Sequence, residues 1–146
     1  MITTIRWSFL LVVQVLVLSF ASNALSQVDP EKALIGTWQG HAETAKNQER
    51  TLVINSVKAT GSGEWVGRGR FGQGVDTDKG GGNTEINISS KNNELYLEWT
   101  GSNGKAPVHV KLVGDNKLEG TIEAFERKQV AERRITFEKV KAGDVK

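Results

Sequence analysis

Apolar and polar residues alternate with a period of two along most of the chain from Leu34 onward. For example, Leu95, Leu97 and Trp99 alternate with polar neighbours. This spacing is typical of β-strands that bury one face and expose the other to water. It predicts eight strands, at residues 36–44, 51–58, 64–72, 84–90, 94–100, 107–114, 117–125 and 133–140.

The segments between these strands are short and rich in residues that favour chain reversal. Four of them are Gly61-Ser62-Gly63, Lys91-Asn92-Asn93, Ser102-Asn103-Gly104 and Gly114-Asp115-Asn116. Strands joined in this way form an antiparallel meander. We therefore expect an all-β fold, an eight-stranded antiparallel up-and-down barrel, because closure removes the exposed sheet edges. A two-sheet β-sandwich is the structural alternative.

The first 24 residues differ from the rest of the chain. Arg6 precedes an apolar run over residues 7–20, and small residues follow up to Ala24. This pattern predicts a secretory signal peptide over residues 1–24, with an uncleaved anchor as the alternative. The mature chain would begin near Leu25 or Gln27. We expect a linker or a single helical turn over residues 25–33, a barrel domain over residues 34–141 and a tail over residues 142–146.

Composition narrows the setting and the partners. The chain has no cysteine, which excludes disulfides and thiolate metal sites and favours a bacterial periplasmic or extracellular protein. Lys and Arg number 19 against 17 Asp and Glu, and the two signs are interleaved along the chain. Nucleic-acid binders usually carry a basic surplus, so nucleic acid is not an expected partner. With the leader removed, we expect no membrane span.

Three short motifs resemble those of calycin barrels, the group of lipocalins, fatty-acid-binding proteins and avidins. They are Gly36-Thr37-Trp38, Trp99-Thr100-Gly101 and the closing segment 136–140. The resemblance implies that Trp38 closes one barrel end beneath a basic side chain from late in the chain, with Arg133 or Arg134 as the candidates. Biotin binding is not implied, because Gly40 stands where avidins have an asparagine.

Several large aromatic residues fall on inward positions. Such residues either fill the core of a small barrel or surround a ligand. The candidates for a ligand site are Trp38, Trp65, Phe71, Trp99 and Phe137. Inward glycines such as Gly40, Gly69 and Gly120 either leave room for a ligand or let the strands coil. The other inward residues are mostly aliphatic, so we expect any interior ligand to be largely apolar.

No arrangement in the sequence indicates catalysis, a metal site or a cofactor. His41 and His109 have no nucleophile motif nearby, and the acidic segment 76–83 lacks the full calcium-loop pattern. Arg68 and Arg70 could join later basic residues in an anion-binding patch, or pair with acidic residues on neighbouring strands. We therefore expect an exported, non-catalytic barrel that binds a small apolar molecule or an envelope component. The alternative is a structural or protein-interaction module with a solid core.

Overall fold

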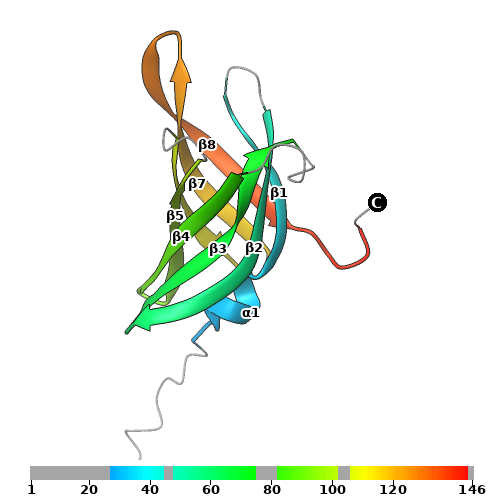
Figure 1. The fold of residues 1–146 in the computed structure, drawn as a ribbon, viewed down its shortest axis with the longest axis vertical. Helices are drawn as coiled ribbons and strands as arrows, with labels where there is room; N and C mark the ends of the chain where they lie inside the picture. Colours follow the sequence, from blue (N-terminus) through cyan, green and yellow to red (C-terminus); the bar gives the residue numbers. More distant parts are fainter. Residues whose placement is uncertain (1–26, 45–47, 75–81, 102–105, 145–146) are drawn as a thin grey trace, which may run out of the picture.

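Eight antiparallel strands close into a barrel in the computed structural model, which describes residues 27–44, 48–74, 82–101 and 106–144 (Figure 1). Each strand pairs with the next in sequence, and β8 returns to pair with β1. The strands are β1 (Gly36–Ala42), β2 (Gln48–Gly61), β3 (Glu64–Gln73), β4 (Gly82–Lys91), β5 (Glu94–Thr100), β6 (Pro107–Val113), β7 (Lys117–Glu126) and β8 (Gln129–Lys139).

The pairing of β1 with β8 decides between a barrel and a sandwich. It runs from Trp38 opposite Lys139 to Ala42 opposite Ile135, and it leaves neither terminal strand as a free edge over this length. The predicted all-β class and up-and-down barrel are therefore confirmed. The architecture is consistent with the resemblance to calycin barrels.

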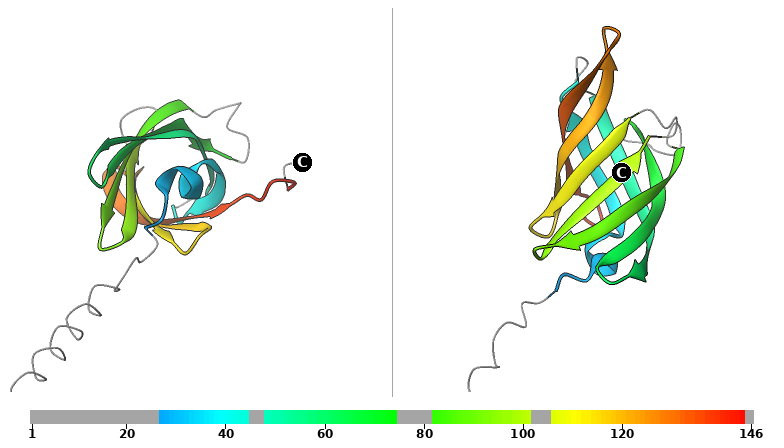
Figure 2. Two further views of the ribbon diagram at one scale, coloured as in Figure 1. Left: turned by 90° about the horizontal axis from the view of Figure 1, so that it is seen from below. Right: turned by 90° about the vertical axis from the view of Figure 1, so that its left-hand side faces the viewer.

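A short helix, α1 (Pro30–Leu34), lies across one end of the barrel (Figure 2, left). Asp29 caps its N-terminus by accepting a hydrogen bond from the Glu31 backbone N–H, and Pro30 occupies the first turn, where proline is tolerated. Leu34 is fully buried against the core. The indole of Trp38 donates a hydrogen bond to the Leu34 carbonyl at 2.9 Å, so the helix and the first strand close this end together.

The interior follows the predicted alternation. The residues less than 5 % exposed include Ile86 and Ile88 on β4, Leu95 and Leu97 on β5, Val108 and Val110 on β6, Leu118 and Ile122 on β7, and Ile135 and Phe137 on β8. Large side chains from every strand fill the barrel between its two ends.

Inward glycines bring the strands together and leave no room for a ligand. A Cβ at Gly40 would overlap the carbonyl oxygen of Thr136, and one at Gly69 would overlap that of Val53. The backbone of the neighbouring strand therefore occupies the space that these glycines leave, which favours the coiling interpretation of these residues.

Two long strands begin earlier than the alternation predicts. β2 begins at Gln48 rather than Thr51, and β8 begins at Gln129 rather than Arg133. The turn between β7 and β8 consists of Arg127 and Lys128, both at positive φ. Neither residue type favours that conformation, so the sequence carries no turn signal there and the prediction of a longer loop was wrong.

Candidate functional site

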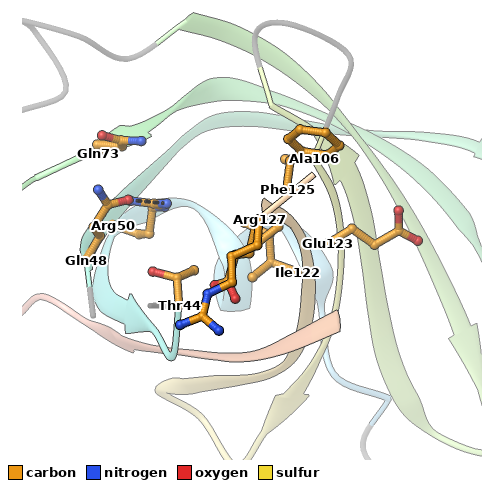
Figure 3. A pocket seen from close by; sticks show the side chains of 11 residues that line it. Thr44, Gln48, Arg50, Gln73, Ala106, Ile122, Glu123, Phe125 and Arg127 are labelled. Atoms are coloured by element: carbon orange, nitrogen blue, oxygen red, sulfur yellow. Dashed lines mark hydrogen bonds between the residues drawn. The ribbon is translucent and has the colours of Figure 1, made fainter. Parts of the chain in front are cut away.

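A cavity of about 480 Å³ lies at the barrel end opposite α1, which we call the open end (Figure 3). Its walls come from Thr44 just after β1, the first residues of β2, the last residues of β3 and β7, Ala106 just before β6, and the turn after β7. Side chains alternate across a strand, so Arg50 points inward like Leu52 two residues further along β2. The cavity is lined by Thr44, Gln48, Arg50, Gln73, Ala106, Ile122, Glu123, Ala124, Phe125, Glu126 and Arg127.

One wall of the cavity is polar and centres on Arg50. Gln48, Arg50 and Gln73 lie together on this side (Figure 3). Arg50 is only 8 % exposed, and its guanidinium donates to Gln48 Oε1 at 3.0 Å and to the Glu49 carbonyl at 3.3 Å. Both acceptors are uncharged. Burial lowers the pKa of Arg50, although a guanidinium remains protonated in proteins.

Arg50 has no acidic partner within ion-pair distance among the described residues. Two carboxylates contribute to the cavity lining, and both belong to β7. Glu126 forms an ion pair with Arg133 at 2.6 Å. The carboxylate of Glu123 points away from Arg50 (Figure 3). Among the described residues, therefore, no carboxylate pairs with the buried charge of Arg50 at this cavity.

A second buried polar group faces the same cavity. The hydroxyl oxygen of Thr44 is shielded from solvent and has no hydrogen-bond partner among the described residues. Buried polar atoms in native proteins almost always have a partner, so an orphan atom at a cavity points to a ligand or a water molecule. The Thr44 hydroxyl and the remaining N–H groups of the Arg50 guanidinium are therefore available to form hydrogen bonds with a molecule in the cavity.

The apolar side chains of the lining lie mainly on the side opposite Arg50, among the charged residues of β7. Phe125 and Ala106 lie across the cavity from Arg50, and Ile122 and Ala124 add aliphatic surface (Figure 3). The cavity volume falls within the usual range for small-molecule sites in proteins. A site with a buried cation on one side and apolar surface on the other suits a molecule that has both an anionic group and an apolar body.

The predicted aromatic candidates lie elsewhere in the barrel. Phe71, Trp99 and Phe137 form a packed cluster, with ring centroids 5.4 to 6.4 Å apart. Trp38 is at the helix-covered end, and Trp65 is half-buried against the core. None of the five lines the cavity at the open end. Their packing fits the interpretation that these residues are barrel core.

The basic side chain over Trp38 is Lys139. Its Nζ lies 5.3 Å from the indole centroid and donates to the Ala33 carbonyl at 2.8 Å, near the end of α1. Arg133 instead pairs with Glu126, and Arg134 lies 3.8 Å from Glu119. Lys139 therefore occupies the place that the resemblance assigned to an arginine.

The basic residues, histidines and acidic segment considered in the sequence analysis do not come together in one site among the described residues. Arg68 pairs with Glu85 across β3 and β4 at 3.5 Å, as the alternative to an anion patch expects. His109 lies 3.3 Å from Glu98 on the outer face, and neither histidine lines the cavity. The acidic segment 76–83 lies mostly outside the described residues, as do residues 1–26 with the whole predicted leader.

Two searches of the described residues gave negative results. Across residues 27–44, 48–74, 82–101 and 106–144, no three His, Asp or Glu side chains are grouped as a metal ion would require. Within the same ranges, no helix has the length and apolar character needed to cross a membrane.

The sequence analysis missed Arg50. The predicted strand began at Thr51, which left Arg50 in a loop. The available signal was that Arg50, two positions before Leu52, falls on the inward side if the strand is extended by one residue.

No family model matches the chain, and no curated protein matches it significantly. The function must therefore be argued from the site itself.

Proposed function

We propose that the protein is an exported, non-catalytic barrel that binds a small amphipathic anion in the cavity at its open end. One observation carries the proposal. The guanidinium of Arg50 is buried, lines this cavity and has only neutral hydrogen-bond partners among the described residues.

The energetics of a buried charge support an anionic ligand. Removing an ion from water costs several kcal/mol, and proteins usually offset this cost with an ion pair. Arg50 has no such pair among the described residues, and its two neutral acceptors leave other N–H groups of the guanidinium available. A carboxylate or phosphate group accepts two parallel hydrogen bonds from an arginine, so it would supply both charge and geometry.

The apolar wall supports an amphipathic ligand over a small inorganic anion. Ile122, Ala124 and Phe125 offer surface that an inorganic anion would leave unused. This proposal adds an anionic group to the largely apolar ligand expected from the sequence, because the open end provides polar groups that the inward face of the core lacks. The resemblance to lipocalins and fatty-acid-binding proteins supports small-molecule binding in general.

A matched pair of ligands tests the proposal. We expect dodecanoate to bind at least tenfold more tightly than dodecanol in isothermal titration calorimetry, because only the acid can neutralise Arg50. Arg50→Gln should weaken dodecanoate binding by about tenfold or more and leave dodecanol binding unchanged. Arg68→Gln is the control, since Arg68 is exposed on the outer surface of β3.

Two results would count against the proposal. If dodecanoate and dodecanol bind equally and Arg50→Gln affects neither, the cavity does not recognise an anion. If neither molecule binds, the alternative from the sequence analysis becomes the better one, namely a module with a solid barrel that acts through its outer surface.

Export is part of the proposal and has its own test. We expect protein recovered outside the cytoplasm to begin between Leu25 and Val28, because the small residues up to Ala24 suit a signal peptidase. N-terminal sequencing decides this. Finding Met1 on the recovered protein would show that the leader is retained.

A further inference from the structure

Strands β7 and β8 continue beyond the rest of the barrel at its open end. The pairing of β7 with β6 ends where Ile122 lies opposite Val108, and the pairing of β8 with β1 ends where Ile135 lies opposite Ala42. Past these points β7 and β8 pair with each other as far as Glu126 and Gln129. Residues 123–132 thus form a two-stranded ribbon that projects from the barrel, which we call the projecting hairpin (Figure 2, right).

The projecting hairpin exposes two large apolar side chains at one level. Phe125 and Val130 are cross-strand partners, 75 % and 64 % exposed respectively. Other large apolar residues in the described part of the chain are far less accessible, the most exposed being Val28 at 40 % and Val113 at 37 %. An isolated exposed apolar residue needs no explanation, but a cross-strand pair on a projecting ribbon forms a small apolar surface.

The turn of the projecting hairpin has a conformation that its residues do not favour. Arg127 has φ 48° and Lys128 has φ 69°, in the left-handed region. The turn between β4 and β5 has the same conformation but uses Asn92 and Asn93, which tolerate it well. Backbone strain of this kind often marks a functional position. Two cations therefore occupy the outermost point of the hairpin at some conformational cost.

Charge and apolar surface are layered along the projecting hairpin. The two cations lie at the turn, and Phe125 and Val130 lie two residues before and after it. Glu123 and Glu132 lie a further two residues back toward the barrel, opposite each other. Glu126, next to the turn, is paired with Arg133. The tip therefore presents positive charge and apolar surface, while the carboxylates of Glu123 and Glu132 are set back toward the barrel.

We propose that the projecting hairpin docks onto an anionic lipid surface. Phe125 and Val130 enter the interfacial zone, and Arg127 and Lys128 contact the phosphate groups of the lipids. Apolar insertion combined with basic residues is the general mode of peripheral membrane binding. The small size of the hairpin favours this partner, because a stable protein interface usually buries about 800 Å² on each side and two side chains cannot supply that area.

The location of the hairpin links this surface to the cavity. Phe125 and Arg127 also line the cavity at the open end. Docking by the projecting hairpin would therefore hold the cavity mouth close to the lipid surface. The docking proposal does not depend on ligand binding, since the exposed residues and the turn are present in the chain without a ligand.

Vesicle sedimentation tests the docking. We expect the protein to bind vesicles of equal parts phosphatidylglycerol and phosphatidylcholine, and to bind pure phosphatidylcholine vesicles much more weakly. Lys128→Asn should weaken binding about fivefold, the usual contribution of one cation near a charged membrane. Val130→Ser should weaken it severalfold. Neither residue lines the cavity, so both variants leave the proposed ligand site intact.

Matched variants at the other end of the barrel serve as controls. Val113→Ser removes an exposed valine next to the β6–β7 turn, and Asn92→Asp changes a turn of the same conformation. Both should bind vesicles like the unchanged protein, apart from a small electrostatic effect of the added acid. All variants are compared in the same processed form, with equal melting temperatures as the check on folding.

A fluorescence measurement reports insertion directly. A Val130→Trp variant should show a blue shift of tryptophan emission when anionic vesicles are added, because the indole enters a less polar environment. Binding that is equal for neutral and anionic vesicles, or equal losses for Val113→Ser and Val130→Ser, would overturn the proposal. The proposal would also be overturned if Lys128→Asn and Val130→Ser left vesicle binding unchanged but altered the oligomeric state in sedimentation velocity. That result would identify the projecting hairpin as a contact between copies of the protein.

Discussion

Truncation of Trp38 is the sharpest test of how the barrel is closed. The side chain is fully buried, its Nε1–H donates to the Leu34 carbonyl at 2.9 Å, and Lys139 lies over the ring. A buried tryptophan removes about 200 Å² from water, which corresponds to about 5 kcal/mol at 25 cal/mol per Å². Since alanine keeps part of this contact, we expect Trp38→Ala to lower the free energy of unfolding by about 4 kcal/mol.

A second variant separates the hydrogen bond from the packing. Trp38→Phe keeps an aromatic ring but cannot donate to the Leu34 carbonyl, so it should lose about 1 to 2 kcal/mol. Trp65→Ala is the matched control for aromatic truncation, because Trp65 is only half-buried at the edge of the core. It should cost clearly less than Trp38→Ala.

Urea unfolding followed by circular dichroism provides the measurement. Circular dichroism is preferable to tryptophan emission here because the variants change the fluorophores themselves. The free energies come from linear extrapolation to zero denaturant. A loss below about 1 kcal/mol for Trp38→Ala, or a loss no larger than that of Trp65→Ala, would refute a closing role for this residue and for α1.

Five further variants test other features of the barrel by the same unfolding measurement. Gly120→Ala should destabilise strongly because its Cβ would overlap a carbonyl oxygen of β6, whereas Gly101→Ala should be tolerated. Lys128→Gly should stabilise by about 1 kcal/mol by relieving the positive φ. Arg50→Met should leave the ligand-free protein at least as stable, since it removes an uncompensated buried charge; a large loss would contradict this. Hydrogen bonds from Tyr96 and then Lys111 lower the pKa of Glu94, so this group stabilises the fold at neutral pH and loses that effect on acidification below about pH 4.5. Glu94→Gln should show a smaller loss of stability there.

The sequence was enough to predict eight antiparallel strands, with a barrel favoured over a sandwich, because burial acts on every second residue of a strand. The pairs Ile86 and Ile88, and Val108 and Val110, each lie on the buried face of one strand, while their neighbours face water. The two-residue turn Asn92-Asn93 then reverses the chain between adjacent strands. Closing eight such strands into a barrel avoids open edges, which favoured the barrel, and the pairing of β1 with β8 then decided the matter. These local preferences are independent of distant contacts, so they can be recognised in the sequence.

The length of the projecting hairpin was not predictable in the same way. Arg127 and Lys128 do not favour a tight turn, and residues 129–132 show no alternation that would bury one face. Pairing with β7 draws them into β8 nonetheless. Cross-strand hydrogen bonds, rather than local propensity, extend the ribbon past the barrel.

The sequence by itself determined the all-β class, the approximate positions of the strands and their inward faces. Tertiary structure decided which cation covers Trp38, which end is closed by α1 and where a cavity remains. It also decided that Arg50 faces that cavity with no acidic partner in the described part of the chain. The reason is physical: alternation depends on neighbours along one strand, whereas the partner of a charge depends on residues from several strands that meet only when the barrel closes.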